Sequence, residues 1–190
     1  MKKLLLKIVL GLLLGTNACA ENIKFTKIIN LDKPWGSSFI SDNEMIVTEK
    51  SGKIKIINIK NGDVNKIEHN LNFLETGQGG LLDIIYKDNY LWVSYSENRG
   101  NSETSTSVAR GKFNKEKIDF KNIFQANPPI DSGYHFGSRL AIKDNYIFAS
   151  VGERGQGMIA QDPTQHPGSI IRVHLDGSIP KDNPKFEGKK

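Results

Sequence analysis

The sequence has almost no cysteine, since its 190 residues contain a single one, Cys19, near the amino terminus. A chain with one cysteine forms no internal disulfide and holds no cluster of thiolate metal ligands. The residues after Cys19 also offer no cysteine nucleophile. Stability must therefore come from a packed core, and any chemistry from other side chains.

Long apolar runs are lacking too, except at the amino terminus. There a basic start precedes an apolar segment, residues 8–14, and Ala18-Cys19-Ala20 fits the small-residue pattern of a cleavage site. This combination predicts a signal peptide over residues 1–20 and a mature domain over residues 21–190. The apolar run is too short to span a bilayer, so we expect a periplasmic or secreted protein without a transmembrane segment after cleavage. An uncleaved anchor and a lipoprotein at Cys19 are the alternatives.

A strong excess of one charge is lacking once the leader is set aside. The whole chain carries 26 basic and 21 acidic residues, a net charge of +5. Three lysines lie in the first 20 residues, which hold no acid, so the mature chain has 26 − 3 = 23 basic residues against 21 acidic ones. A net charge of +2 with scattered lysines does not predict a basic nucleic-acid surface, and no nucleic acid is expected as a partner.

Helical periodicity is lacking after the leader, and short alternating segments take its place. Four such segments follow one another between residues 35 and 68, and Asn61-Gly62-Asp63 is a strong hairpin signal among them. The arrangement recurs in residues 80–124 and again in residues 133–175. The sequence therefore predicts an all-β chain.

An Asp-Asn turn marks the same place in each repeat, at Asp42, Asp88 and Asp144. The spacings are 88 − 42 = 46 and 144 − 88 = 56 residues. A four-stranded unit that recurs at about 40 to 50 residues is typical of β-propeller blades. A two-sheet sandwich is the alternative, but its strands would not be expected to share one turn sequence. We predict about three four-stranded blades in an open arc, and hence the amino-terminal part of a longer protein, because three blades do not close a ring.

Three polar residues next to predicted strands are candidates for a site. His135 begins one strand of a hairpin and Glu153 follows the other, so the hairpin brings a potential base and a carboxylate to one rim. Tyr134 and Phe136 flank the histidine and would offer an apolar wall to a flat ring. Gln78 lies in a glycine-rich turn and offers both a donor and an acceptor.

Each candidate also has a purely structural explanation. Gln78 would then be an ordinary turn residue, His135 a histidine bonded to the backbone, and Glu153 half of an ion pair with Arg154 or with another cation of the rim. Glutamates recur at matching ends of the repeats, at Glu49, Glu97 and Glu153. That recurrence leaves open a calcium site of carboxylates near the propeller axis.

Four linked motifs occur in order along the chain: G-Q-G-G-L-L at 77–82, Y-H-F-G-S-R-L at 134–140, V-G-E-R-G at 151–155 and G-S-I-I-R at 168–172, the last followed by D-G-S-I-P-K-D-N-P at 176–184. In these motifs the chain resembles the amino-terminal half of a soluble aldose sugar dehydrogenase of the glucose/sorbosone dehydrogenase family. The resemblance runs from about residue 34 to the end. Members of that family use pyrroloquinoline quinone on a six-bladed propeller.

The resemblance implies a role for each candidate. His135 matches the general base that takes the proton of the anomeric hydroxyl while a hydride leaves the same carbon for the quinone. Gln78 matches a glutamine of the sugar site. Glu153 stands where glucose-specific members carry an aspartate, and the longer side chain is typical of the branch that accepts a broader range of aldoses. The products would be lactones, and an external electron acceptor would reoxidise the cofactor.

The resemblance also implies that much of the site lies elsewhere. The family's residues that hold the quinone, and the carbonyls that bind a neighbouring calcium ion, mostly follow the position of Lys190. No cofactor-binding or metal-binding residue is therefore assigned, and we expect these 190 residues alone to be inactive. The alternatives are a non-catalytic sugar-binding propeller fragment and a calcium-dependent, lactonase-like hydrolase.

Overall fold

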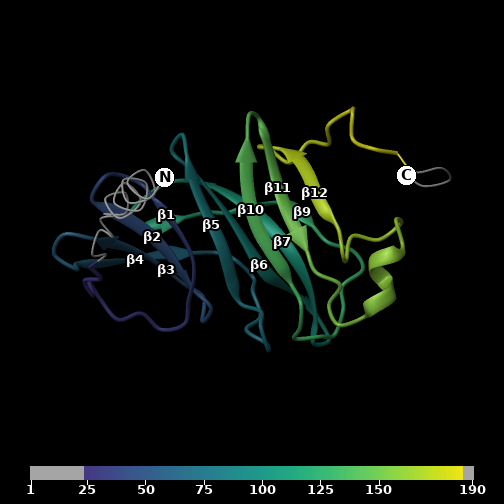
Figure 1. Cartoon of the computed structure of the whole chain (residues 1–190), viewed down its shortest axis with the longest axis horizontal. Helices are drawn as coiled ribbons and strands as arrows, with labels where there is room; N and C mark the ends of the chain where they lie inside the picture. Colours follow the sequence, from purple (N-terminus) through teal and green to yellow (C-terminus); the bar gives the residue numbers. More distant parts are fainter. Residues whose placement is uncertain (1–23, 186–190) are drawn as a thin grey trace, which may run out of the picture.

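The computed structural model describes residues 24–185. The predicted signal peptide, residues 1–20, lies outside the described residues. Within them the regular structure is β, apart from one short 3₁₀ helix, η1 (Gly157–Gln161), as Figure 1 shows. No helix in the described range is long and apolar enough to cross a membrane.

The first sheet is the predicted series of four antiparallel strands, β1 (Pro34–Phe39), β2 (Glu44–Glu49), β3 (Lys53–Asn58) and β4 (Val64–His69). In β3 the alternation of lysine and isoleucine buries Ile54 and Ile56 while the lysines stay partly exposed. A two-residue strand, β8 (Lys117–Ile118), adds to the outer edge in parallel with β4.

The second sheet contains β5 (Leu81–Lys87), β6 (Tyr90–Gly100), β7 (Glu103–Lys112) and β9 (Lys121–Gln125). Residues 117–124, the last segment of the second predicted unit, do not form one strand, because they are divided between two sheets. At Phe120 the chain crosses from one to the other, and the Asn70 side chain replaces a strand neighbour there. Asn70 accepts from the Phe120 N–H at 2.8 Å and donates to its carbonyl at 3.1 Å.

The third sheet has three antiparallel strands in the described residues, β10 (Gly137–Lys143), β11 (Tyr146–Val151) and β12 (Ile170–His174). The predicted Asp-Asn turns join the first two strands of all three sheets. Asp88, Asn89 and Asp144 have positive φ angles of 47°, 62° and 54°, a conformation that Asp and Asn adopt more readily than other side chains. The turn chemistry read from the sequence is therefore confirmed.

A hydroxyl contact repeats in all three sheets. At a β-bulge of the first strand, a backbone N–H donates to a hydroxyl on the second strand, in the pairs Gly36–Thr48 (3.0 Å), Asp83–Ser94 (2.9 Å) and Arg139–Ser150 (3.0 Å). The Thr48 hydroxyl also donates to the Leu82 carbonyl of the second sheet. The Ser94 hydroxyl donates to the Ser138 carbonyl of the third sheet at 2.6 Å. Each of these two hydroxyls thus joins one sheet to the next.

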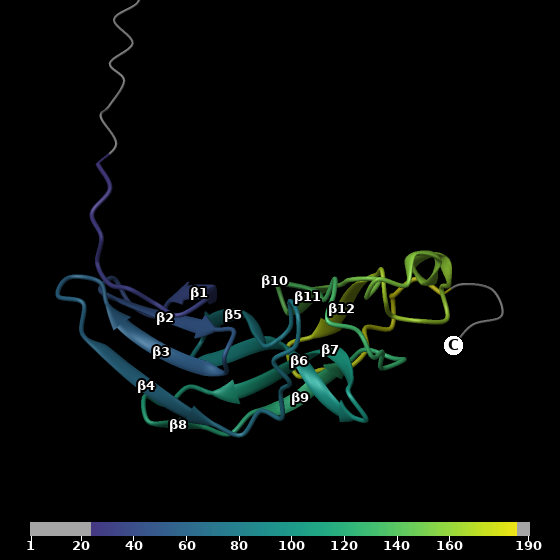
Figure 2. The ribbon, with the colours of Figure 1, turned by 90° about the horizontal axis from the view of Figure 1, so that it is seen from below.

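Apolar side chains fill the two spaces between neighbouring sheets. One cluster, which includes Ile46 and Ile84, lies between the first and second sheets. The other, which includes Trp92 and Leu140, lies between the second and third. Strand β5 contacts both β1 and β10, and Figure 2 shows the three sheets as an open fan with these strands on its inner side. Three sheets in series are the arrangement predicted for propeller blades, and they exclude a two-sheet sandwich.

Candidate active site

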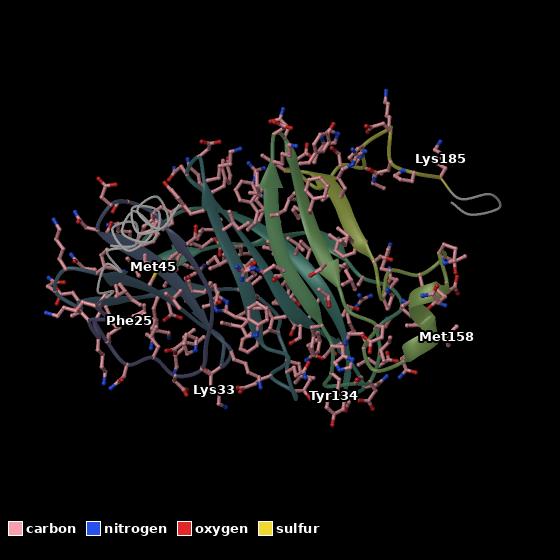
Figure 3. All side chains as sticks on the ribbon, viewed as in Figure 1. Phe25, Lys33, Met45, Tyr134, Met158 and Lys185 are labelled. Atoms are coloured by element: carbon pink, nitrogen blue, oxygen red, sulfur yellow. The ribbon has the colours of Figure 1, made fainter. Side chains whose placement is uncertain are left out.

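The three candidate residues lie together at one end of the fan. Gln78 is in the turn before β5, His135 immediately precedes β10, and Glu153 follows β11. Figure 3 labels Tyr134, the neighbour of His135, at this end, which is opposite the turn that joins β10 to β11. The predicted meeting of these residues at one rim is confirmed, whereas their chemical roles stay predictions.

His135 and Glu153 form a directly bonded pair. The Nδ1 atom of His135 contacts Oε1 of Glu153, which also accepts from the Gly155 N–H at 3.1 Å. The bond from His135 holds the pKa of Glu153 below its ordinary value, so the carboxylate is ionised at neutral pH. A carboxylate at Nδ1 selects the tautomer with the proton on that nitrogen, which leaves the lone pair on Nε2. The atom suited to accept a proton is therefore Nε2.

Gln78 fixes the backbone of the histidine. Its Oε1 accepts from the His135 N–H at 2.9 Å, and its own N–H donates to the Gly133 carbonyl at 2.7 Å. A Cβ on Gly77 would overlap Gly133, so glycine lets the two loops meet. The acceptor of the Gln78 amide is thus used within the protein, and its NH₂ group is the part suited to a ligand.

The loops that carry the pair have an unusual backbone. His135 and Arg154 have φ angles of 47° and 59°, in the left-handed region that costs energy for residues with a Cβ. Contacts between the loops hold this conformation: Gly152 N–H donates to the Phe136 carbonyl at 3.1 Å, and Arg154 N–H to the His135 carbonyl at 3.3 Å. A Cβ on Gly152 would overlap the His135 carbonyl, so the pair depends on this glycine.

Arg154 is the structural residue that sequence reasoning missed. Its side chain is only 2% exposed and bonds to oxygen atoms from Thr104, Ser132 and Tyr134. Burial lowers its pKa to about 10, which leaves it charged at neutral pH. The alternative of an ion pair with Glu153 is therefore wrong, because Arg154 turns inward and ties down the loop that carries His135.

The two aromatic neighbours of His135 do not form the predicted wall together. Phe136 is buried, with the Arg154 guanidinium 3.7 Å from its ring centroid. Tyr134 is 62% exposed, and its ring meets that of His135 edge to face with centroids 6.2 Å apart. Only Tyr134 is thus placed to offer a flat apolar surface beside the histidine. The Phe136 ring instead packs in the interior against the guanidinium of Arg154.

The other recurring glutamates do not join the site. Glu49 is buried and ion-paired with Lys55 at 2.7 Å. Glu97 accepts from three side chains of its own sheet, Ser107, Asn122 and Gln125. No group of three or more His, Cys, Asp or Glu residues that could hold a metal ion occurs in residues 24–185. Both carboxylates are occupied by groups of their own sheets, which argues against the lactonase-like alternative.

Comparison with known proteins agrees with this architecture. The family model described as Glucose / Sorbosone dehydrogenase matches residues 31–190. "Aldose sugar dehydrogenase YliI" of Escherichia coli (strain K12) is 32% identical over 164 residues, which cover 81% of this chain and 44% of the relative. The chain therefore spans less than half the length of that curated relative.

Solved structures show the same arrangement of sheets. A crystal structure of a glucose dehydrogenase superposes with a TM-score of 0.80 at 26% identity, over 87% of this chain and 52% of the other. The PQQ-bound form of aldose sugar dehydrogenase from Streptomyces coelicolor superposes with a TM-score of 0.75 at 22% identity, over 88% and 52% of the two chains. The fold is thus that of propeller-type glucose dehydrogenases.

Proposed function

Because this chain belongs to the glucose/sorbosone dehydrogenase family, we propose that it forms part of a quinoprotein that oxidises the anomeric carbon of aldose sugars to lactones. The observation that carries the proposal is the bonded pair of His135 and Glu153, with Gln78 fixed to the same backbone. A base oriented by a carboxylate, beside an amide donor, is the equipment that removal of a hydroxyl proton requires.

The proton transfer follows from the geometry of the pair. Nε2 of His135 takes the proton of the anomeric hydroxyl, and the ionised Glu153 stabilises the imidazolium that results. The NH₂ group of Gln78 donates to a sugar oxygen while its carbonyl holds His135 in place. Pyrroloquinoline quinone, when bound, would supply the acceptor for the hydride and pass the electrons to an external acceptor.

The described residues fit the part of such a site that accepts the proton. They do not fit the part that would bind the carboxylates of a quinone. Arg154 is buried and bonded to protein oxygens, and the Lys50 ammonium donates to the Gly77 carbonyl. We therefore assign no residue among 24–185 to the quinone carboxylates or to a calcium ion. The chain's own contribution is the base, its carboxylate and the amide.

The test is aldose oxidation by the full-length protein that contains these residues, supplied with pyrroloquinoline quinone and calcium and followed by reduction of an acceptor dye. The variant His135→Ala is expected to lower kcat at least about 100-fold, the usual contribution of a positioned base. His174→Ala, a histidine at the opposite end of the fan, serves as the matched control. Turnover that His135→Ala leaves unchanged would remove the proposed base.

The alternative of a non-catalytic sugar-binding fragment makes a different prediction. It expects the purified chain to bind an aldose at the same rim without taking up the quinone, and the binding to weaken in Gln78→Ala. Equilibrium binding of glucose and of the quinone, measured separately by calorimetry, distinguishes the two functions.

We also propose export to the periplasm or the medium, on the predicted leader alone. Sequencing of the mature amino terminus from cell fractions tests this location. Cleavage after Ala20 supports it, and an intact Met1 in the cytoplasm contradicts it.

A further inference from the structure

A cavity of about 400 Å³ lies at the end of the fan opposite His135. Its walls come from the start of β6, the end of β7, the start of β9 and the loop after β12. The side chains that matter are Tyr90, Arg110, Lys112, Asp119, Lys121 and Asp176. The volume falls within the range of small-molecule sites in proteins.

Arg110 is held in this cavity by aromatic rings instead of by an acid. Its guanidinium carbon lies 3.7 Å from the Tyr90 ring centroid and 5.4 Å from that of Trp92. Stacking fixes the plane of the guanidinium but satisfies none of its N–H donors in that plane. Its Nε atom is buried without a hydrogen-bond partner among the described residues, so no protein acceptor takes the N–H of that atom.

Two further cations, Lys112 and Lys121, line the same space. No ion pair within residues 24–185 includes either lysine or Arg110. Three cations that form no ion pair among the described residues therefore line one cavity, beside two acids. Such a group attracts an anion, and a stacked guanidinium favours the planar fork of a carboxylate or two oxygens of a phosphate.

The two acids of the cavity already have bonds of their own. Asp119 is paired with Lys117 at 3.1 Å, outside the cavity lining. Asp176 accepts from the N–H and hydroxyl of Ser178 at 2.9 and 2.7 Å, which hold its pKa below the ordinary value. Both carboxylates are therefore suited to accept bonds from ligand hydroxyls, since an ionised carboxylate accepts several at once.

We propose that this cavity binds a small polyhydroxy oxyanion, either a sugar phosphate or a sugar acid. Arg110, Lys112 and Lys121 bind the phosphate or carboxylate group, and Asp119 and Asp176 accept from the hydroxyls. This binding site is separate from the rim of His135 and does not depend on the function proposed for that rim.

Calorimetric titration of the purified protein with glucose 6-phosphate, gluconate and glucose tests the proposal. We expect one or both of the anions to bind, with an affinity that falls as salt rises, while binding of neutral glucose is insensitive to Arg110→Gln. Arg110→Gln is expected to weaken anion binding at least about tenfold, as loss of a charge-assisted bond does. The matched control Lys60→Gln removes the same charge from an exposed position outside the cavity and leaves the affinity unchanged.

Because Arg110 also packs on Tyr90, a second variant separates binding from folding. Lys121→Gln changes an exposed lysine of the cavity and is expected to weaken the anion about threefold or more with the melting temperature unchanged. Binding of the phosphate alone identifies a sugar phosphate, and binding of gluconate alone a sugar acid. Failure of both anions to bind, equal affinities in Arg110→Gln and the parent, or loss of anion binding in His135→Ala would overturn the proposal.

Discussion

The two ends of the fan both contain residues in the left-handed conformation, but for different reasons. At the turn end the residues are Asp88, Asn89 and Asp144, whose short polar side chains tolerate positive φ. At the other end they include His135 and Arg154, which gain nothing locally from it. The turn end thus follows from local sequence, whereas the site end is held by contacts between distant segments.

The largest change in the free energy of unfolding is expected from substitution of Arg154, which holds the site end. Arg154→Ala removes a residue that is only 2% exposed, together with its bonds to the carbonyls of Thr104, Ser132 and Tyr134, which should lower the free energy of unfolding by about 3 kcal/mol or more. Urea unfolding measures the change. The control is Lys60→Ala, an exposed residue whose substitution should cost less than about 1 kcal/mol. Equal costs for the two variants would show that the site end is not held by Arg154.

Gly152 provides the next test, because it separates close approach from backbone conformation. A Cβ there would overlap the His135 carbonyl, and Gly152→Ala should cost about 2 kcal/mol as overpacking does. Gly157 has open space but a φ of 52°, so Gly157→Ala should cost about 1 kcal/mol for conformation alone. Dye reduction by the full-length protein should fall in Gly152→Ala only, since only that change displaces His135. A site that tolerates alanine at 152 with full activity would contradict the steric argument.

A smaller effect is expected from the His135–Glu153 pair as the pH falls. The folded-state pKa of Glu153 is lowered, so its stabilising contribution is present above the unfolded value of about 4.5 and is lost as pH falls through the folded value. Both side chains are partly exposed, which limits the contribution to less than about 1 kcal/mol. The unfolding free energies of the parent and Glu153→Gln should therefore differ at pH 6 and converge as the pH falls below the folded-state pKa of Glu153. A difference that grows as the pH falls would have the wrong sign.

The smallest effect is expected from a glycine substitution at the turn end. Asn89→Gly should change the unfolding free energy by no more than about 0.5 kcal/mol, because glycine accepts positive φ as readily as asparagine. Asn89→Val should cost about 1 kcal/mol or more, since a branched side chain is strained there. Thermal unfolding of the two variants gives the comparison, and equal stabilities would show that the turn is imposed from outside.

The same contrast explains how much the sequence could predict. Strands, turns and the order of the sheets follow from alternation and Asp-Asn turns, which act over a few residues. The path near Phe120 could not be predicted, because the Asn70 side chain that redirects it is 50 residues away in the chain. The inward direction of Arg154 depends on Thr104, again 50 residues away.

The sequence could predict that the candidate site residues lie close together. It could not predict the hydrogen bonds and packing that orient them. The hairpin places His135 and Glu153 at one rim because the first precedes it and the second follows it in the sequence. Their proximity could therefore be predicted from their positions in the sequence alone. The use of the Gln78 carbonyl by the His135 backbone, and the burial of Phe136, depend on how three loops pack. The glycines directly before Gln78 and Glu153 were the local signals of that close packing.

The repeated hydroxyl contact links each of the first two sheets to the next one. It uses a backbone carbonyl and the hydroxyl of Thr48 or Ser94, and it makes no demand on which apolar residues fill the gap beside it. Substitutions in the two cores can therefore accumulate while the pitch of the fan is preserved. Sequences that have diverged in their cores can therefore keep the same arrangement of sheets, and with it the distances between the loops of the rim.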